Sequence, residues 1–332
     1  MIRYRFAAAA GSSLLLLCVC ASETDVDTSR PASLQTDRAT LPPLIEEGRV
    51  AYGTYCVGCH GEAGDGRGEA ARFLHPKPRD FQKANFKFSS TRSGRLPTDD
   101  DLRRTIVEGL RGSAMPGWSL LPDRTVTALI AYIKTFSQKW IDAEVAAAIP
   151  FVEDPYRART DKSAAIERGR AMYHGYATCW TCHPTYESTD RINDYLQAMD
   201  NPTRDAWRSN LFQAEAKPNA EGEIIFPPDF KRDFVRAGTD LEDLYRSIAA
   251  GITGTAMPTW VDSIAYTKPD GAVLTQRSDL WALAYYVQDL IKQRPPKLAP
   301  GAFAVRDRPE PIGFPSATPA QQPVTTEEFF EE

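Results

Sequence analysis

The pattern Cys-x-x-Cys-His occurs twice in the sequence, at residues 56–60 and again at residues 179–183. Two thiols at this spacing can add to the two vinyl groups of one porphyrin, and the adjacent histidine then points at the iron. The same spacing of cysteines also serves thiol–disulfide exchange and zinc binding. The motif therefore limits each segment to one of three chemistries, and its surroundings must decide between them.

Three features favour covalent haem. Both copies carry the histidine, and each is followed by a methionine in the same local setting. A zinc site would need further ligands, whereas two of the four histidines already belong to the motifs. No βαβ pattern, which accompanies a thioredoxin-like motif, lies near either copy. We therefore expect two covalently bound haem c groups. The residues expected to hold them are Cys56, Cys59 and His60, then Cys179, Cys182 and His183.

Both motifs belong to a longer pattern that occurs in each half of the chain. Each half opens with a Gly-Arg pair, has a tyrosine before the motif and an Asp-Phe pair after it, and continues with a short acidic helix that ends in glycine. Six residues beyond that glycine stands the methionine of Ala-Met-Pro-x-Trp. The corresponding positions are Gly48 and Gly169, Tyr52 and Tyr173, Phe81 and Phe230, Gly109 and Gly251, and Met115 and Met257.

The sequence predicts a mainly α fold, because strand-like alternation is scarce. Each half closes with an amphipathic helix, with apolar residues at i, i+3, i+4 and i+7. These residues are Val126, Leu129, Ile130 and Ile133, then Leu280, Leu283, Ala284 and Val287.

These patterns divide the chain into six segments. We expect an export signal at 1–20, a flexible tether at 21–43, a first domain at 44–138, a linker at 139–162, a second domain with insertions and long loops at 163–291, and a disordered proline-rich tail at 292–332.

The order of haem-attachment motif, Met-Pro loop and flanking helices resembles that of class I cytochromes c. The resemblance covers most of residues 44–291 as two tandem units, although the interval from Cys179 to Met257 is longer than in compact members. It implies a small helical fold around each haem, with crossing N- and C-terminal helices, and a role in electron transfer. The implied iron ligands are His60 with Met115 and His183 with Met257.

The chain has other methionines and histidines that could serve as ligands. Methionine is usually a core filler, so we expect Met172 in the core, and Met199 lies in the long insertion. We expect His75 in a surface loop and His174 in a structural role, although His174 could replace Met257 as a ligand.

Two further expectations concern the surroundings of the haem. Arg79 either pairs with a haem propionate or lies exposed beside Asp80. A backbone carbonyl near Pro78 or Pro228 orients the histidine that binds the iron, as groups behind metal ligands commonly do.

The N-terminus is typical of an exported protein. Arg3 and Arg5 precede a short apolar run that ends near residue 21. Cys20 resembles the acylated cysteine of bacterial lipoproteins, although Val19 stands where that family prefers a small residue. Two alternatives stay open for Cys20, a lipid anchor on it or a signal peptide that is removed together with it; an uncleaved anchor ranks behind both, because the run is shorter than the roughly 20 residues that a transmembrane helix needs. Either places the protein in the periplasm.

The net charge of −5 gives no indication of nucleic-acid binding. We expect a dihaem electron carrier, not an enzyme, that acts in a respiratory chain as a shuttle or as a subunit of a membrane redox complex. Its donor would be a quinol-oxidising complex or a dehydrogenase, and its acceptor a terminal oxidase or reductase. The alternative is a dihaem enzyme, peroxidase-like or thiosulfate-oxidising, with one open haem site. Two intact Ala-Met-Pro-x-Trp loops argue against it.

Overall fold

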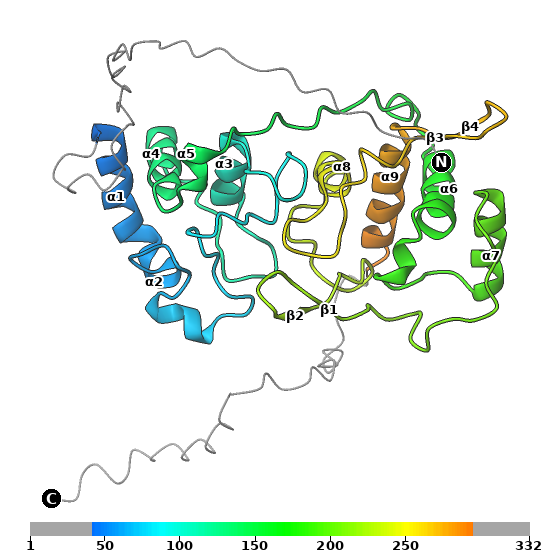
Figure 1. Ribbon diagram of the computed structural model, residues 1–332, viewed down its shortest axis with the longest axis horizontal. Coiled ribbons are helices and arrows are strands. Elements are labelled where there is room, and N and C mark those ends of the chain that lie inside the picture. Colours follow the sequence, from blue (N-terminus) through cyan, green and yellow to red (C-terminus); the bar gives the residue numbers. More distant parts are fainter. Residues whose placement is uncertain (1–41, 295–332) are drawn as a thin grey trace, which may run out of the picture. The chain divides into compact units, whose positions relative to one another are not determined.

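The computed structural model describes residues 42–294, which are mainly helical with two short hairpins (Figure 1). The predicted export signal, the lipidation of Cys20, nearly all of the tether and the proline-rich tail lie outside the described residues. Within residues 42–294, no helix combines the length and the apolar character needed to cross a bilayer.

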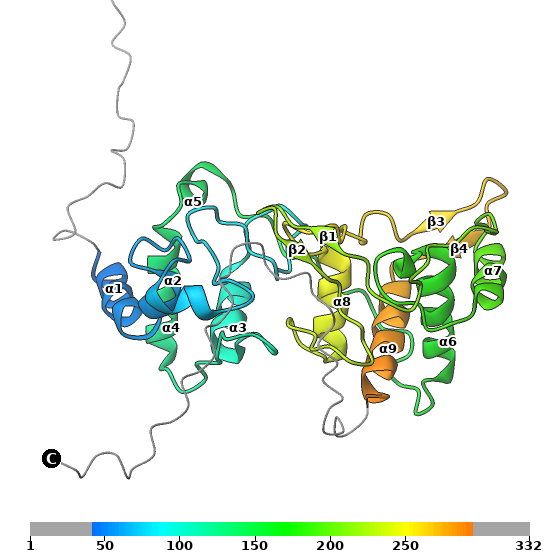
Figure 2. The same cartoon turned by 90° about the horizontal axis from the view of Figure 1, so that it is seen from below.

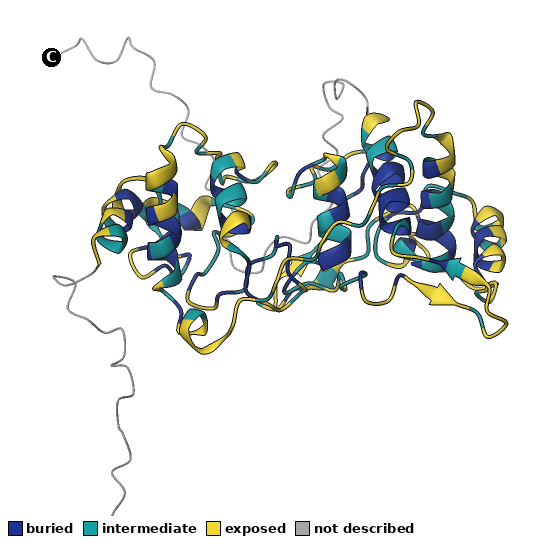
Figure 3. Cartoon of the chain, turned by 90° about the horizontal axis from the view of Figure 1, so that it is seen from above, coloured by how far each residue is buried: buried dark blue, intermediate teal, exposed yellow. Residues whose placement is uncertain are grey.

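The first half is built on two helices that cross, α1 (Pro43–Tyr55) and α4 (Asp123–Lys134). They approach closely at Gly48, where an added Cβ would lie 2.0 Å from the carbonyl oxygen of Ala128. Glycine is therefore required there by the approach of the two backbones. The predicted apolar face of α4, which includes Val126 and Leu129, is buried against α1 (Figure 3).

Short elements complete the first half. They are α2 (Val57–His60), a 3-10 turn at Glu69–Phe73, α3 (Asp99–Glu108) and α5 (Lys139–Asp142). Helix α3 begins with a capping box, in which the Thr98 hydroxyl accepts from the Asp101 N–H and the Asp101 carboxylate accepts from the Thr98 N–H. It ends at Gly109, whose φ of 70° suits glycine. The acidic run at 99–101 thus forms the first turn of the expected acidic helix.

The second half repeats this arrangement. Its crossing helices are α6 (Ser163–Ala171) and α9 (Asp279–Lys292), and a Cβ added at Gly169 would lie 2.0 Å from the Ala282 carbonyl oxygen. The acidic helix α8 (Leu241–Ala250) ends at Gly251, with a φ of 75°. A π-turn at Met172–Tyr176 leads into the second motif, and a 3-10 turn at Cys179–Thr181 forms its first part.

The additional elements of the second half lie in two segments that are longer than their counterparts in the first half. The first contains α7 (Thr189–Ala198) and the antiparallel hairpin of β1 (Lys217–Pro218) and β2 (Ile224–Ile225). The second contains the antiparallel hairpin of β3 (Tyr266–Thr267) and β4 (Val273–Thr275). In Figures 1 and 2, β1 and β2 lie between α3 and α9 along the horizontal axis.

Apolar side chains of the described residues form two clusters, one in each half. Part of the predicted linker packs on the second cluster. The Trp281 indole N–H donates to the Val152 carbonyl at 2.8 Å, and the Phe151 ring stacks on Trp281 with centroids 5.6 Å apart. The Ile149 N–H donates to the Ser90 carbonyl at 2.8 Å, so residues 149–152 contact both halves.

Candidate haem sites

The first motif is a single tight turn. The Cys56 N–H donates to the Tyr52 carbonyl at 2.9 Å, and the His60 N–H donates to the Cys56 carbonyl at 2.9 Å. Cys56 and Cys59 are free, partly buried thiols. In the second motif the His183 N–H donates to the Cys179 carbonyl at 2.9 Å, and both cysteines are again free.

Each motif histidine is held by a backbone carbonyl and an aromatic ring. His60 Nδ1 lies 3.0 Å from the Arg79 carbonyl oxygen, and His183 Nδ1 lies 3.0 Å from that of Pro228. A carbonyl can only accept, so Nδ1 carries the proton and Nε2 keeps the lone pair that binds a metal. The Phe81 ring stacks on His60 with centroids 4.5 Å apart.

The expected carbonyl near Pro228 is therefore Pro228 itself. In the first half the carbonyl belongs to Arg79, which directly follows Pro78. The Arg79 side chain is largely buried, and it pairs with Glu221 of the second half at 3.0 Å. The expectation of an exposed arginine was wrong, because the β1–β2 turn covers this side chain.

The Met115 and Met257 loops share one hydrogen-bond pattern. The Leu110 N–H donates to the Met115 carbonyl at 3.0 Å, and the Met115 N–H donates to the Ser113 hydroxyl at 3.2 Å. In the second half the Ile252 N–H donates to the Met257 carbonyl at 3.2 Å, and the Met257 N–H donates to the Thr255 hydroxyl at 3.2 Å. Both methionines are partly buried, on loops fixed at their bases by the glycine ends of α3 and α8.

Tyr52 of α1 and Tyr173 of the π-turn hold the chain just after each motif. The Tyr52 hydroxyl donates to the Gly61 carbonyl at 2.8 Å, and the Tyr173 hydroxyl donates to the Pro184 carbonyl at 2.7 Å. The sequence predicts only that these rings pack in the helical core. It does not predict their hydrogen bonds, because the acceptors are backbone atoms.

The donor groups fit haem c. Each half offers two thiols on one turn, an imidazole with its Nε2 lone pair available, and a partly buried thioether on a tied loop. Burial lowers the pKa of His60 and of His183, which favours the neutral imidazole that binds iron. Burial also raises the pKa of the Cys56 and Cys179 thiols to about 12.

Residues 43–133 match the family model described as cytochrome C oxidase, cbb3-type, subunit III. These residues form a cytochrome c domain. A cytochrome c domain carries covalently bound haem c and transfers electrons to and from redox protein partners, and such domains are usually periplasmic or extracellular.

The chain is also similar to a solved structure from Kuenenia stuttgartiensis, a chain of its reducing HAO-like protein complex. The two are 29% identical with a TM-score of 0.55, and the match covers 74% of this chain and 96% of the other. It therefore extends well beyond the cytochrome c domain. No curated protein matches the sequence.

The other methionines and histidines have different surroundings. Met172 and Met199 are buried in the second apolar cluster, and His75 is exposed in a loop. His174 is fully buried, and its Nδ1 lies 3.0 Å from the Arg170 carbonyl oxygen. It is surrounded by tyrosine rings, and its Nε2 has no hydrogen-bond partner among the described residues.

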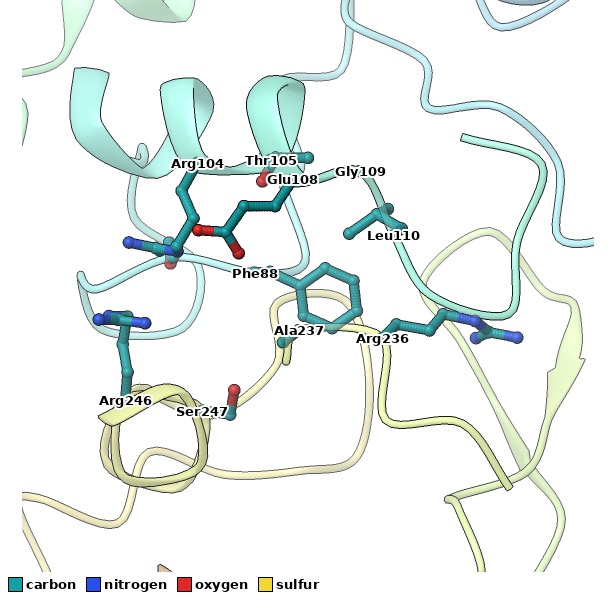
Figure 4. Close-up of a pocket in the computed structure, with 11 residues that line it drawn as sticks. Phe88, Arg104, Thr105, Glu108, Gly109, Leu110, Arg236, Ala237, Arg246 and Ser247 are labelled. Carbon is teal, nitrogen blue, oxygen red and sulfur yellow. The ribbon is translucent and has the colours of Figure 1, made fainter. Parts of the chain in front are cut away.

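A pocket lies where the repeated helices α3 and α8 face each other (Figure 4). Arg104 and Glu108 enter it from α3, and Arg246 from α8. Each of these arginines also pairs with an aspartate of its own helix, Asp101 at 2.6 Å and Asp243 at 2.7 Å. The pocket is thus lined by side chains from equivalent helices of the two halves.

Proposed function

We propose that the chain is a dihaem c-type cytochrome that passes single electrons between redox proteins in the periplasm. In this proposal His60 and Met115 bind one iron, and His183 and Met257 bind the other. The first pair lies in the cytochrome c domain that the family model matches.

The second haem is supported by contacts that the second half repeats. In each half the motif histidine donates to a backbone carbonyl and stacks on the phenylalanine that lies two residues after that carbonyl. The ring centroids are 4.5 Å apart in the first half and 4.9 Å apart in the second. The methionine loops and the tyrosine bonds repeat as well. This recurrence of a complete set of contacts is the observation on which the proposal rests.

These residues favour a carrier over an enzyme. Haem c supplies a single-electron couple at its iron when it is bound. The thioethers of Met115 and Met257 favour the reduced state and would occupy the sixth position. Hydrogen bonds hold each methionine loop in place, so small molecules would have little access to an iron bound there.

We extend the proposal to attachment and partners. The similar Kuenenia chain belongs to a complex with a HAO-like protein, and this favours a subunit of a redox complex over a free shuttle. Lipidation of Cys20 would hold such a subunit at the membrane, with support from more than one acyl chain. Mass spectrometry of the mature N-terminus tests this part of the proposal.

The decisive experiment is a haem count combined with carbon monoxide binding. The mature chain is expressed in a host that attaches haem c, and haem per chain is measured by pyridine haemochrome. We expect two haems, one in a Cys179→Ser/Cys182→Ser variant, and a reduced spectrum that carbon monoxide leaves unchanged. A single haem in the unaltered protein would refute the dihaem assignment. Rapid carbon monoxide binding to one haem would favour the alternative, an enzyme with one open site.

A further inference from the structure

Residues 219–222, in the turn between β1 and β2, belong to an insertion that the first half lacks. The Asn219 side-chain oxygen accepts from the N–H groups of Glu221 at 2.9 Å and Glu223 at 2.8 Å. Gly222 takes a φ of +82°, which suits glycine. These bonds fix the conformation of the turn that carries Ala220 and Glu221.

On one side the turn contacts the residue that orients His60. Glu221 Oε1 lies 3.0 Å from the Arg79 guanidinium, and the two side chains are only 20% and 23% exposed. The Arg79 carbonyl in turn accepts from His60 Nδ1 at 3.0 Å. Glu221 thus acts on the first haem site through a single intervening residue.

On the other side the same turn contacts the Met257 loop. The Ala220 N–H donates to the Gly254 carbonyl at 2.9 Å. Gly254 has a φ of +74°, and a Cβ added there would lie 3.5 Å from the Ala220 Cβ. The next residue, Thr255, accepts from the Met257 N–H at 3.2 Å. Ala220 thus supports the loop that presents the second thioether.

The carboxylate of Glu221 also balances a local excess of positive charge. Burial lowers the pKa of Lys87, the Arg79 guanidinium lowers it further, and Glu221 acts in the opposite direction. Arg236 also lowers the Lys87 pKa and Glu223 opposes it, so removal of the Glu221 carboxylate would leave three cations, Arg79, Lys87 and Arg236, against the single carboxylate of Glu223.

We propose that residues 219–222 are a positioning element shared by both haem sites, with Glu221 acting on His60 and Ala220 on the Met257 loop. The inference rests on the proposed function, because it requires a haem in each half. It assigns to an inserted hairpin the task of tuning the reduction potential of each of the two haems from one turn.

The test is a redox titration of the holoprotein and its variants. In Glu221→Gln we expect the His60/Met115 couple to rise in potential, because loss of a negative charge disfavours ferric iron. The expected change is about threefold or more in the reduction equilibrium constant. Glu221→Asp keeps the negative charge, so the potential of this couple should stay close to that of the unaltered protein. A Met115→His variant identifies this couple, since loss of the thioether lowers its potential.

Ala220→Pro removes the N–H that donates to Gly254. We expect the other couple to fall in potential and its ferrous haem to bind carbon monoxide, because the methionine loop is less firmly held. Ala220→Gly, which keeps the N–H, is the matched control. If the proline variant loses its fold, Asn219→Ala, which releases the turn, replaces it.

Asp262→Asn controls for a general loosening of the two halves. It removes the exposed ion pair between the halves, in which an Asp262 carboxylate oxygen lies 2.7 Å from the Arg92 guanidinium. The substitution alters neither Arg79 nor Ala220. A haem count below two in the unaltered protein would defeat the proposed function. Two haems whose potentials stay fixed in both turn variants, or move equally in Asp262→Asn, would overturn the inference alone.

Discussion

Replacement of Gly48 by alanine tests whether close contact of the terminal helices holds the first half together. The added Cβ would lie 2.0 Å from the Ala128 carbonyl oxygen and 2.8 Å from the Tyr132 Cβ. A carbon–oxygen contact needs roughly 3.3 Å, so α4 must move by roughly 1.3 Å. That movement would pull its buried face, including Leu129, away from α1.

The size of the effect follows from two opposing terms. Overpacking of this kind costs about 3 kcal/mol. Alanine is a better helix former than glycine by about 1 kcal/mol. We therefore expect Gly48→Ala to lower the free energy of unfolding by about 2 kcal/mol. Gly53 lies in the same helix, and a Cβ there meets nothing within 4 Å, so Gly53→Ala should be neutral or slightly stabilising.

Guanidinium denaturation of the holoprotein, followed by far-ultraviolet circular dichroism, measures the difference. We expect the midpoint to fall in Gly48→Ala and to hold or rise in Gly53→Ala, with similar slopes. Gly169→Ala repeats the test in the second half, where the clash with the Ala282 oxygen is again 2.0 Å. Equal midpoints for Gly48→Ala and Gly53→Ala would refute the close-contact argument.

Three further predictions follow from the site geometry. Met115→Ala should let carbon monoxide bind one of the two ferrous haems, and a carbon monoxide difference spectrum without that signal would remove Met115 as a ligand. Burial raises the pKa of Asp101, but hydrogen bonds led by those from Ser90 outweigh burial and hold this pKa below its ordinary value. The Asp101 carboxylate therefore stabilises the fold at neutral pH, and this contribution is lost as pH falls below about 4. Asp101→Asn should therefore lower stability at pH 7 by about 2 kcal/mol and flatten the acid limb of the stability curve, and an unchanged acid limb in urea titrations would contradict this. Tyr173→Phe leaves the Pro184 carbonyl without its donor and should cost about 1 to 2 kcal/mol in thermal or urea unfolding, whereas an unaltered midpoint would show that bond to be unimportant.

The helical framework was largely predictable because its signals are local. The apolar spacing of Val126 to Ile133 defines the buried face of α4, and the acidic run at 99–101 marks the start of α3. The cysteines and histidines of the two motifs are adjacent in sequence, so the sequence alone indicates their chemistry. The two short hairpins were not predicted, since strands of two or three residues carry no alternation.

Contacts between distant segments lay beyond sequence reasoning. Glu221 meets Arg79 across 142 positions, and neither residue has a local pattern that indicates the other. The carbonyl groups that orient His60 and His183 belong to the backbone, which every residue shares. Phe81 and Phe230 stood out as a repeated pair, but their stacking on the histidines depends on how each loop returns to its motif.

The π-turn at Met172–Tyr176 shows how the second half took up extra length. Cys179 follows Tyr173 by six residues, whereas Cys56 follows Tyr52 by only four. The wider turn and the left-handed Thr178, with its φ of 44°, absorb the difference, and the Tyr173 hydroxyl still reaches the residue after the motif. Natural variation can therefore lengthen the chain between such anchored points without moving the anchors. Of the residues in between, His174, Gly175 and Ala177 are themselves buried, so the extra length is packed inside the second half and not displayed on its surface.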